Sequence, residues 1–451
     1  MKRKGAVNLT EGNVLKVLVT FSLPLMLSTV LQQVYNIADS MIVGKFSGEL
    51  SLAAIGAAYP ITLFFIAVAT GASMGCAVVI SNIYGSGRMK DFKCAVWTAI
   101  ISLGVLGIIV SAAGIIFAGP LMHLLNAPDS IFANARAYLM IYSAGVLPML
   151  LYNSFSGIFT GLGDSRTPLY MLAFSSVLNI ILDLIAVRNL SLGVIGAAWA
   201  TTISQVCAAL LTFVFLMRRT NTLCPEKQSR YFDRGLLKVI ASAAVPCILQ
   251  QGSVALTHTI VQSILNTYDT SIIAGYEAAS KLHNFAYMGM NTIGTAFASF
   301  TGQCYGAGKY ERIKEGFRTS TLIILACTAV FILLFQFIPR QLIGLFVDET
   351  ASELVFEAGV NFLRIISPVY IIICYIISTG GLLRGTGKSF TFFVETVAEF
   401  IVRVTMCFVL TDMLASYTGL MWAWYFGSTV GFILCLILSI RVFKGFKKQP
   451  S

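Results

Sequence analysis

Apolar stretches of about twenty residues, the length of α-helix that crosses a bilayer, recur along the whole chain. We count twelve of them, and no segment between them is long enough for a separate soluble domain. Hydrophobic residues make up 57% of the chain, charged residues only 11%, and the mean hydropathy is +0.82, which excludes an ordinary water-soluble protein. We therefore expect an all-α polytopic membrane protein. The predicted spans are 15–40, 52–81, 93–118, 133–159, 168–187, 193–216, 237–264, 272–300, 317–338, 357–382, 390–411 and 418–442.

The basic residues predict the orientation of the chain. Most of the 31 Lys and Arg residues fall in alternate connecting segments and near the two ends, and short cytoplasmic loops are enriched in such residues. Both termini are therefore expected to be cytoplasmic. The net charge of +11 follows from this topology and from attraction to anionic membrane lipids, so it gives no reason to expect nucleic acid as a partner. The first residues lack the pattern of a cleaved signal peptide, so the first span is expected to be retained.

An internal repeat divides the chain into two halves. The motif YGxG occurs at 84–87 and again at 305–308, each time before a basic segment, and Pro24 and Pro246 occupy matching positions ahead of it. The two copies are roughly 220 residues apart, which predicts two six-helix bundles. Because six is even, both halves enter the membrane from the same side, and the repeat is parallel; such two-lobed chains usually carry a substrate between their halves. The predicted domains are the N-terminal half 1–217, the cytoplasmic loop 218–236 and the C-terminal half 237–451.

The first span carries a polar stripe that ends in a carboxylate. The stripe consists of Ser28, Gln32, Tyr35, Asn36 and Asp39, which fall on one face of a helix of 3.6 residues per turn. Polar side chains in a membrane cost free energy unless they face a protein interior or a water-filled cavity, so Asp39 is a candidate functional residue. A position of Asp39 at the membrane interface is the alternative, although an interfacial residue needs no such stripe.

A second polar face is predicted in the fifth and sixth spans. Asn179 and Asp183 lie one helical turn apart, and together with a second buried acid they suggest a shared polar site; a structural role for an acid near a helix end is the alternative. In the sixth span Thr201 and Gln205 share a face, and Thr202 lies beside them. Threonine hydroxyls bind either a ligand or a carbonyl of their own helix, and the sequence does not favour one over the other.

The second half has no acid opposite Asp39, so any coupling chemistry is expected to be asymmetric. Glu395, Glu399 and Arg403 follow one another at one-turn steps in the eleventh span. Opposite charges one turn apart satisfy each other, which favours an ion pair; contact of Glu399 with a cationic substrate is the alternative. His258 lies in mid-membrane, where a satisfied interior imidazole is favoured over a titrating one.

Aromatic and methionine side chains are candidates for an adaptable pocket, because aromatic faces attract organic cations and thioethers repack readily. Tyr35, Met288 and Met290 belong to this group. Ordinary packing against lipid or protein is the alternative.

The sequence lacks the motifs of an enzyme or a metal protein. It has three histidines and neither HExxH nor GxSxG, and its ten cysteines fall singly without CxxC, so no catalytic site, disulfide, metal or cofactor is predicted. The segment 385–389, GTGKS, resembles the end of a phosphate-binding loop, but Leu382 occupies the position of the required first glycine. An ion gradient is therefore a better energy source than ATP.

Taken together, the motifs resemble the multidrug and toxic compound extrusion (MATE) family, in its DinF-like or archaeal-type branch. The resemblance covers about residues 10–444 and rests on these segments: 24–39, YGxG at 84–87, GLGDSRTP at 161–168, NIILD at 179–183 and GAAWAT at 196–201. It implies a V-shaped pair of six-helix bundles. It also implies an antiporter of a bacterial cytoplasmic (inner) membrane, acting as a monomer, that exports cationic or amphipathic drugs in exchange for H⁺ or Na⁺.

The resemblance further implies the functional residues. Asp39, Asn179 and Asp183, with Thr201 or Thr202, would form the cation-coupling site, where Asp39, Asn179 and Asp183 would also bind Na⁺ if sodium is the coupling ion. A sodium site in the second half is not expected, because spans 7 and 10 lack the acids that another branch has there. The residues predicted to contact the substrate are Gln32, Tyr35, Asn36, Glu399, Met288 and Met290.

Two other functions remain open. A flippase for lipid-linked oligosaccharides or cell-wall precursors belongs to the same superfamily, but it would favour a strongly cationic cavity, whereas the buried basic residues here are few, chiefly Arg364 and Arg403. A passive channel would also use buried polar residues, and a dependence of flux on an opposing gradient would distinguish an exchanger from it.

Overall fold

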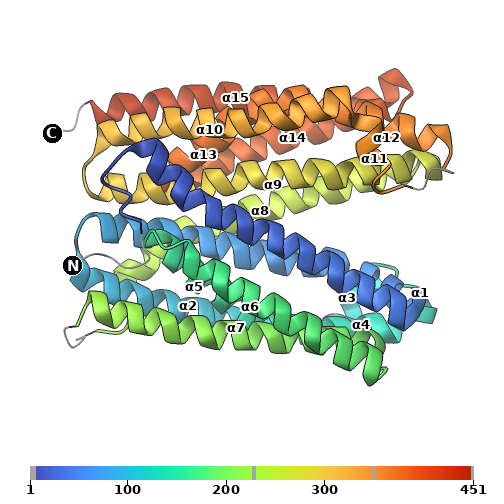
Figure 1. The fold of residues 1–451 in the computed structure, drawn as a ribbon, viewed down its shortest axis with the longest axis horizontal. Helices are drawn as coiled ribbons and strands as arrows, with labels where there is room; N and C mark the ends of the chain where they lie inside the picture. The colour runs from blue at the N-terminus through green and yellow to red at the C-terminus, as the bar shows by residue number, and fades with distance from the viewer. Residues whose placement is uncertain (1–6, 226–229, 348–350, 448–451) are drawn as a thin grey trace. The chain divides into compact units, whose positions relative to one another are not determined.

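The computed structural model describes residues 7–225, 230–347 and 351–447, and over these residues it contains helices and no strand (Figure 1). The predicted all-α fold is thus confirmed. The elements in chain order are α1 (Val14–Gly85), α2 (Met89–Ile116), α3 (Ala118–Leu124), α4 (Asp129–Ala144), α5 (Val146–Gly161), α6 (Arg166–Asp183), η1 (Leu184–Asn189), α7 (Gly193–Leu223), α8 (Arg234–Leu265), α9 (Thr270–Gly306), α10 (Tyr310–Phe337), α11 (Pro339–Ile343), α12 (Glu353–Ile366), η2 (Ser367–Val369), α13 (Tyr370–Gly385), α14 (Ser389–Leu414) and α15 (Thr418–Phe446).

The helices account for the predicted membrane spans. Within the described residues, nine helices are long and apolar enough to cross a membrane, and α4 and α5, bent by 42° at their junction, make a tenth. Helix α1 supplies two of the nine, because the chain breaks at Gly48, whose φ of 78° lies in the left-handed region that favours glycine. Helices α9 and α14, of 37 and 26 residues, are long enough to span as well. These twelve segments overlap the twelve predicted spans, with ends that differ by at most eight residues.

The chain forms two compact units. One contains Met1–Asn8 and Thr20–Gly252, and the other contains Leu9–Val19 and Ser253–Ser451, as far as their residues are described. Each unit therefore includes a short segment from the other half of the sequence. The predicted domain division at 218–236 stays a prediction, and residues 226–229 of that loop lie outside the described residues.

Small residues allow the helices of the first unit to pack closely. A Cβ atom at Gly71 would lie 2.6 Å from the backbone nitrogen of Ile248, so only glycine permits this approach of α8 to α1. Ser73 packs its hydroxyl against α5 and donates a hydrogen bond to the carbonyl oxygen of Asn153 at 2.7 Å. Helices α2 to α7 also belong to this unit; α5 packs against both α2 and α7, and α6 packs against α7.

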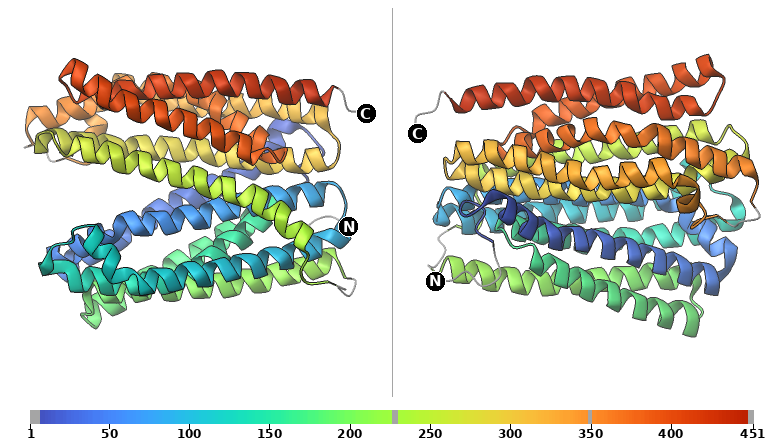
Figure 2. Two further views of the ribbon diagram at one scale, coloured as in Figure 1. Left: turned by 180° about the vertical axis from the view of Figure 1, so that it is seen from behind. Right: turned by 45° about the horizontal axis from the view of Figure 1, so that its top comes forward.

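The second unit is built around α9, which packs against α10, α12 and α13, while α14 and α15 run side by side (Figure 2). Helix α9 begins at a side-chain cap, in which Asp269 accepts a hydrogen bond from the backbone N–H of Ser271 at 2.7 Å. This unit also holds the segment before α1. Three donors of one guanidinium group bind that segment: Arg312 donates to the carbonyl oxygens of Leu9, Glu11 and Gly12 at 3.1, 2.8 and 2.7 Å.

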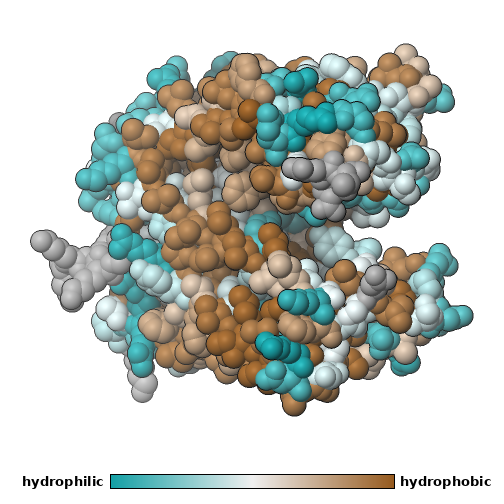
Figure 3. Space-filling model, turned by 45° about the vertical axis from the view of Figure 1, so that its right-hand side comes forward, coloured by the Kyte–Doolittle hydropathy of each residue, from teal (hydrophilic) through white to brown (hydrophobic). Residues whose placement is uncertain are grey.

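Large apolar side chains are exposed on the surface. On α2, for example, Val105, Ile108 and Ile109 are each more than half exposed. Brown, apolar residues cover broad areas of the face that Figure 3 displays. Exposure of this extent would cause aggregation in water and is what contact with lipid requires.

Candidate functional site

Two acidic side chains meet inside the first unit. Asp39 lies on the first part of α1, and Asp183 is the last residue of α6; their carboxyl groups interact directly. The Oδ1 atom of each is buried and has no hydrogen-bond partner among the described residues. Two ionised carboxylates this close would repel each other at a site with little water, so the contact favours a proton on one of them. The pair can therefore hold a shared proton.

Asn179 fixes one member of the pair. It lies one turn before Asp183 on α6 and is only 1% exposed. With its amide turned so that both amide atoms are satisfied, Nδ2 donates to Asp183 Oδ2 at 2.9 Å, and the amide oxygen accepts from the backbone N–H of Thr201 at 3.3 Å. Helix α7 is thereby connected to α6 at the level of the acids. Asp183 is thus held by an amide donor of its own helix, whereas Asp39 lies on a different helix.

Three tyrosines surround the acid pair. The hydroxyl of Tyr35, one turn before Asp39, hydrogen-bonds the side chain of Thr201. Helix α4 contributes Tyr138 and Tyr142, whose ring centroids are 5.8 Å apart and which both interact electrostatically with Asp39. These two residues of α4 are not among the predicted site residues. Their one-turn spacing is a weak signal that is consistent with a shared face, but it does not reveal which helix that face meets.

An apolar cluster closes one side of the site. Val43, Val187 and Ala197 pack together and are 0%, 1% and 2% exposed. Each lies one helical turn from a polar residue of the site, on the side of the loop between η1 and α7. The segment that carries Val187 is the π-helix η1, which begins directly after Asp183; such wider turns are often found at functional sites. These three side chains offer water no hydrogen-bonding group.

Other predicted residues of the first unit do not join the acid pair. The hydroxyl of Thr202 donates to the carbonyl oxygen of Ile141 on α4 at 3.2 Å, so it faces a different helix from Thr201. Gln32 and Asn36 are exposed, and the amide of Asn36 donates to Gln33 Oε1 at 3.4 Å. Their predicted roles toward ions and substrate stay predictions.

In the second unit, Glu399 is engaged by Arg403. The two form an ion pair one turn apart on α14, with side chains only 15% and 12% exposed. The guanidinium group of Arg403 also lies over the ring of Trp424, 3.9 Å from its centroid. Met290 on α9 is fully buried, and Met288 is half-buried. A role of these residues toward a substrate stays a prediction.

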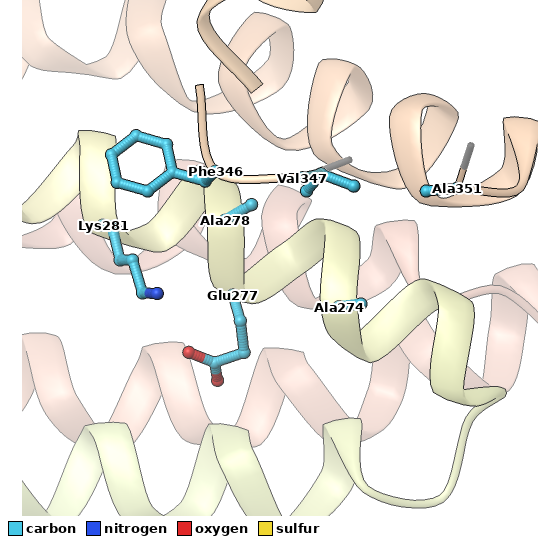
Figure 4. Close-up of a pocket in the computed structure, with 7 residues that line it drawn as sticks. All are labelled: Ala274, Glu277, Ala278, Lys281, Phe346, Val347 and Ala351. Atoms are coloured by element: carbon cyan, nitrogen blue, oxygen red, sulfur yellow. The ribbon is translucent and has the colours of Figure 1, made fainter. Parts of the chain in front are cut away.

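A separate cavity of about 360 Å³ lies in the second unit, between α9 and the segment that follows α11 (Figure 4). Lys281 lies against it, with Nζ 5.7 Å from the centroid of the Phe346 ring. None of the predicted site residues lines this cavity. Its lining residues are Ala274, Glu277, Ala278, Lys281, Phe346, Val347 and Ala351.

Over the described part of the chain, no three or more His, Cys, Asp or Glu residues come together in a way that could hold a metal ion. The acid pair supplies two carboxyl groups and Asn179 supplies a carboxamide, with tyrosine and threonine hydroxyls beside them. Chemically, this arrangement can bind and release a proton or attract an organic cation.

Known proteins resemble the chain over most of its length. The MatE family model matches residues 24–185 and 246–409. The chain is 28% identical over 336 residues, 73% of each chain, to the probable multidrug resistance protein YoeA of Bacillus subtilis (strain 168), and 28% identical over 395 residues, 88% of each chain, to the probable multidrug resistance protein YpnP of the same organism. A crystal structure of MATE in complex with MaL6 has the same fold, with a TM-score of 0.92 at 23% identity over 99% of this chain and 100% of that one.

Proposed function

Because the chain belongs to the MatE family, we propose that it is a secondary active exporter that couples drug efflux to a proton shared by Asp39 and Asp183. The relatives named as multidrug resistance proteins support efflux of multiple drugs as the activity. The direct contact between the two buried carboxyl groups is the observation that supports the proton as the coupling ion, because a single shared proton removes the repulsion between them.

The electrostatics of the pair connect the proton to the substrate. Loss of the shared proton leaves two negative charges in contact, which is costly inside a membrane unless a cation neutralises one of them. An organic cation near Asp39 supplies that charge, and the rings of Tyr35, Tyr138 and Tyr142 offer the aromatic faces that such cations favour. Proton and cationic substrate therefore replace each other at the site, which is the requirement for exchange.

The helices determine which side of the membrane the site faces. Asp183 is held by Asn179, so the carboxyl group that moves when the proton leaves is that of Asp39 on α1. Pro24, inside α1, removes a backbone hydrogen bond and is where this helix bends most easily. In the state described, the cluster of Val43, Val187 and Ala197 keeps water away from the acids on one side. Export then requires that proton and substrate bind the two orientations with different affinity.

The proposal is tested by uptake of a fluorescent organic cation into inside-out vesicles under an imposed proton gradient, an imposed sodium gradient or neither. We expect accumulation that follows the proton gradient and is lost in Asp39→Asn and Asp183→Asn. Asp412→Asn, which neutralises an exposed acid near the end of α14, is the matched control and should transport normally.

Other outcomes would contradict parts of the proposal. Accumulation that follows sodium alone would replace the proton by sodium as the coupling ion. Full accumulation in Asp39→Asn would exclude the acid pair from the coupling step. If no gradient drives accumulation, export of organic cations is wrong, and transfer of a labelled lipid precursor between leaflets becomes the next measurement.

A further inference from the structure

Helix α14 of the second unit carries one more buried acid than its cation can neutralise. Glu395, Glu399 and Arg403 follow one another at one-turn intervals. Arg403 pairs with Glu399 and stacks on Trp424, so its positive charge is committed to the nearer acid. Glu395 lies one turn further away. Like charges one turn apart on a helix repel each other, and a charged Glu395 would face a charged Glu399.

The surroundings of Glu395 do not compensate a negative charge. The residue is 2% exposed, and its Oε1 atom is buried without a hydrogen-bond partner among the described residues. The groups beside it are weak donors: the hydroxyl of Thr396 reaches Oε2 at 3.4 Å, and the thiol of Cys435 interacts with the side chain. A buried carboxylate with so little support is very costly in a membrane protein. Something must neutralise it.

The two acids of α14 converge on one point of α15. A Cβ atom at Gly431 would lie 2.8 Å from Glu395 Oε1 and 3.2 Å from Glu399 Oε2. Both oxygen atoms therefore lie against the bare backbone of this glycine. Over the described residues, no set of acids, histidines and cysteines gathers as a metal site. A proton is the occupant that fits.

Among the described residues, the groups from the neighbouring helices that interact with this cluster are two histidines, a tyrosine and a thiol. From α8, His258 faces Arg403; from α9, Tyr287 interacts with both acids and His283 with Arg403. His283 is already engaged, because its Nδ1 lies 2.7 Å from the hydroxyl of Tyr370 on α13. From α15 comes the thiol of Cys435.

We propose that Glu395 is a second exchangeable proton site of this transporter, separate from the Asp39–Asp183 pair. A proton from water binds the Glu395 carboxylate and gives a neutral carboxylic acid beside the Glu399–Arg403 ion pair. When the proton returns to water, the two carboxylates compete for the one guanidinium group, and the packing of α14 against α15 loosens. The contribution of this proton to export rests on the proposed function, whereas its binding does not.

The site is tested by infrared difference spectroscopy between acidic and alkaline pH on purified, reconstituted protein. The background is Asp39→Asn/Asp183→Asn, which removes the acid pair of the first unit. We expect the carbonyl stretch of a protonated, water-excluded carboxylic acid in this background and its loss when Glu395→Gln is added. Glu357→Gln, at an exposed acid of α12, is the matched control and should keep the band. A band that is unchanged in Glu395→Gln would overturn the proposal.

Two further variants test the site even if Glu395→Gln does not fold. Gly431→Ala places a methyl group against both carboxyl groups, and Glu399→Gln removes the neighbouring charge; each should shift the band or its midpoint pH while the thermal unfolding of the protein stays cooperative. Unshifted bands in both would also overturn the site. The infrared result is independent of the result of the vesicle experiment. If Asp39→Asn still exports and the infrared band depends on Glu395, the proposed function is wrong and the Glu395 proton site stands.

Discussion

The carboxyl groups of Asp39 on α1 and Asp183 on α6 interact directly. This contact joins the first and fifth predicted spans at one buried point. The amide of Asn179 donates a hydrogen bond to Asp183 and holds the acid of α6, so we expect the acid of α1 to be the movable partner.

Replacement of Asn179 by Val should destabilise the protein and weaken export. The variant leaves Asp183 Oδ2 without its amide donor, and an unsatisfied buried acceptor costs about 1–3 kcal/mol, more when it is charged. The measurement is the thermal unfolding midpoint in detergent, with cation uptake in vesicles as the second readout. Asn153→Val is the control, because that amide donates to a carbonyl of its own helix, Met149. Equal midpoints in the two variants would argue against a special role of Asn179.

Replacement of Tyr142 by Leu should weaken binding of an organic cation, whereas Tyr142→Phe should not. An aromatic ring contributes about 0.5–2 kcal/mol to binding of a cation, which corresponds to an increase in Kd of roughly 2- to 30-fold on its removal. Fluorescence titration of the purified protein with a fluorescent organic cation measures this. Tyr170→Leu, at an exposed tyrosine of α6, controls for general effects of the substitution. If Phe and Leu at 142 behave alike, the ring does not contact the cation.

Replacement of Val187 by Ser should make the protein leak protons. Val187 packs with Val43 and Ala197 one turn beyond the acids, and a hydroxyl group there gives water a polar step toward Asp183. The measurement is the decay of an imposed pH gradient across vesicles without any substrate. Val177→Ser, at an exposed position of α6, is the matched control. A gradient that decays at the wild-type rate in Val187→Ser would show that these three residues are not the barrier.

Replacement of Arg312 by Ala should release the segment before α1 from the second unit. The guanidinium group donates to three backbone carbonyls of residues 9–12, and a hydrogen bond from a charged donor contributes about 1.5–3 kcal/mol. In Arg312→Ala we expect faster hydrogen exchange in residues 9–19 and a lower unfolding midpoint. Arg312→Lys should give values between those of the wild type and Arg312→Ala, because an ammonium group cannot reproduce the guanidinium geometry. Arg318→Ala, exposed on the same helix, is the control. Unchanged exchange in Arg312→Ala would contradict the role of this contact.

Much of the fold could be predicted from the sequence, because a bilayer imposes a length and a hydrophobicity on every helix that crosses it. The one-turn spacing of Asn179 and Asp183 also predicted a shared helix face, and the structure brings these two residues together with Asp39 and Thr201. Thr202 shows the limit of that argument. It follows Thr201 directly, yet one residue turns the helix by about 100°, and its hydroxyl faces Ile141 on α4.

What the sequence by itself determined is the type, number and polarity of the helices, since these depend on residues close together in the chain. Only the tertiary structure decided which faces meet. It placed Tyr138 and Tyr142 beside Asp39. It also packed Val43, Val187 and Ala197 together one turn from the acids, and it paired Arg403 with Glu399. Helical periodicity defines a direction around one axis, whereas a site requires the positions of several axes relative to one another, and those are set by side-chain packing between segments distant in sequence.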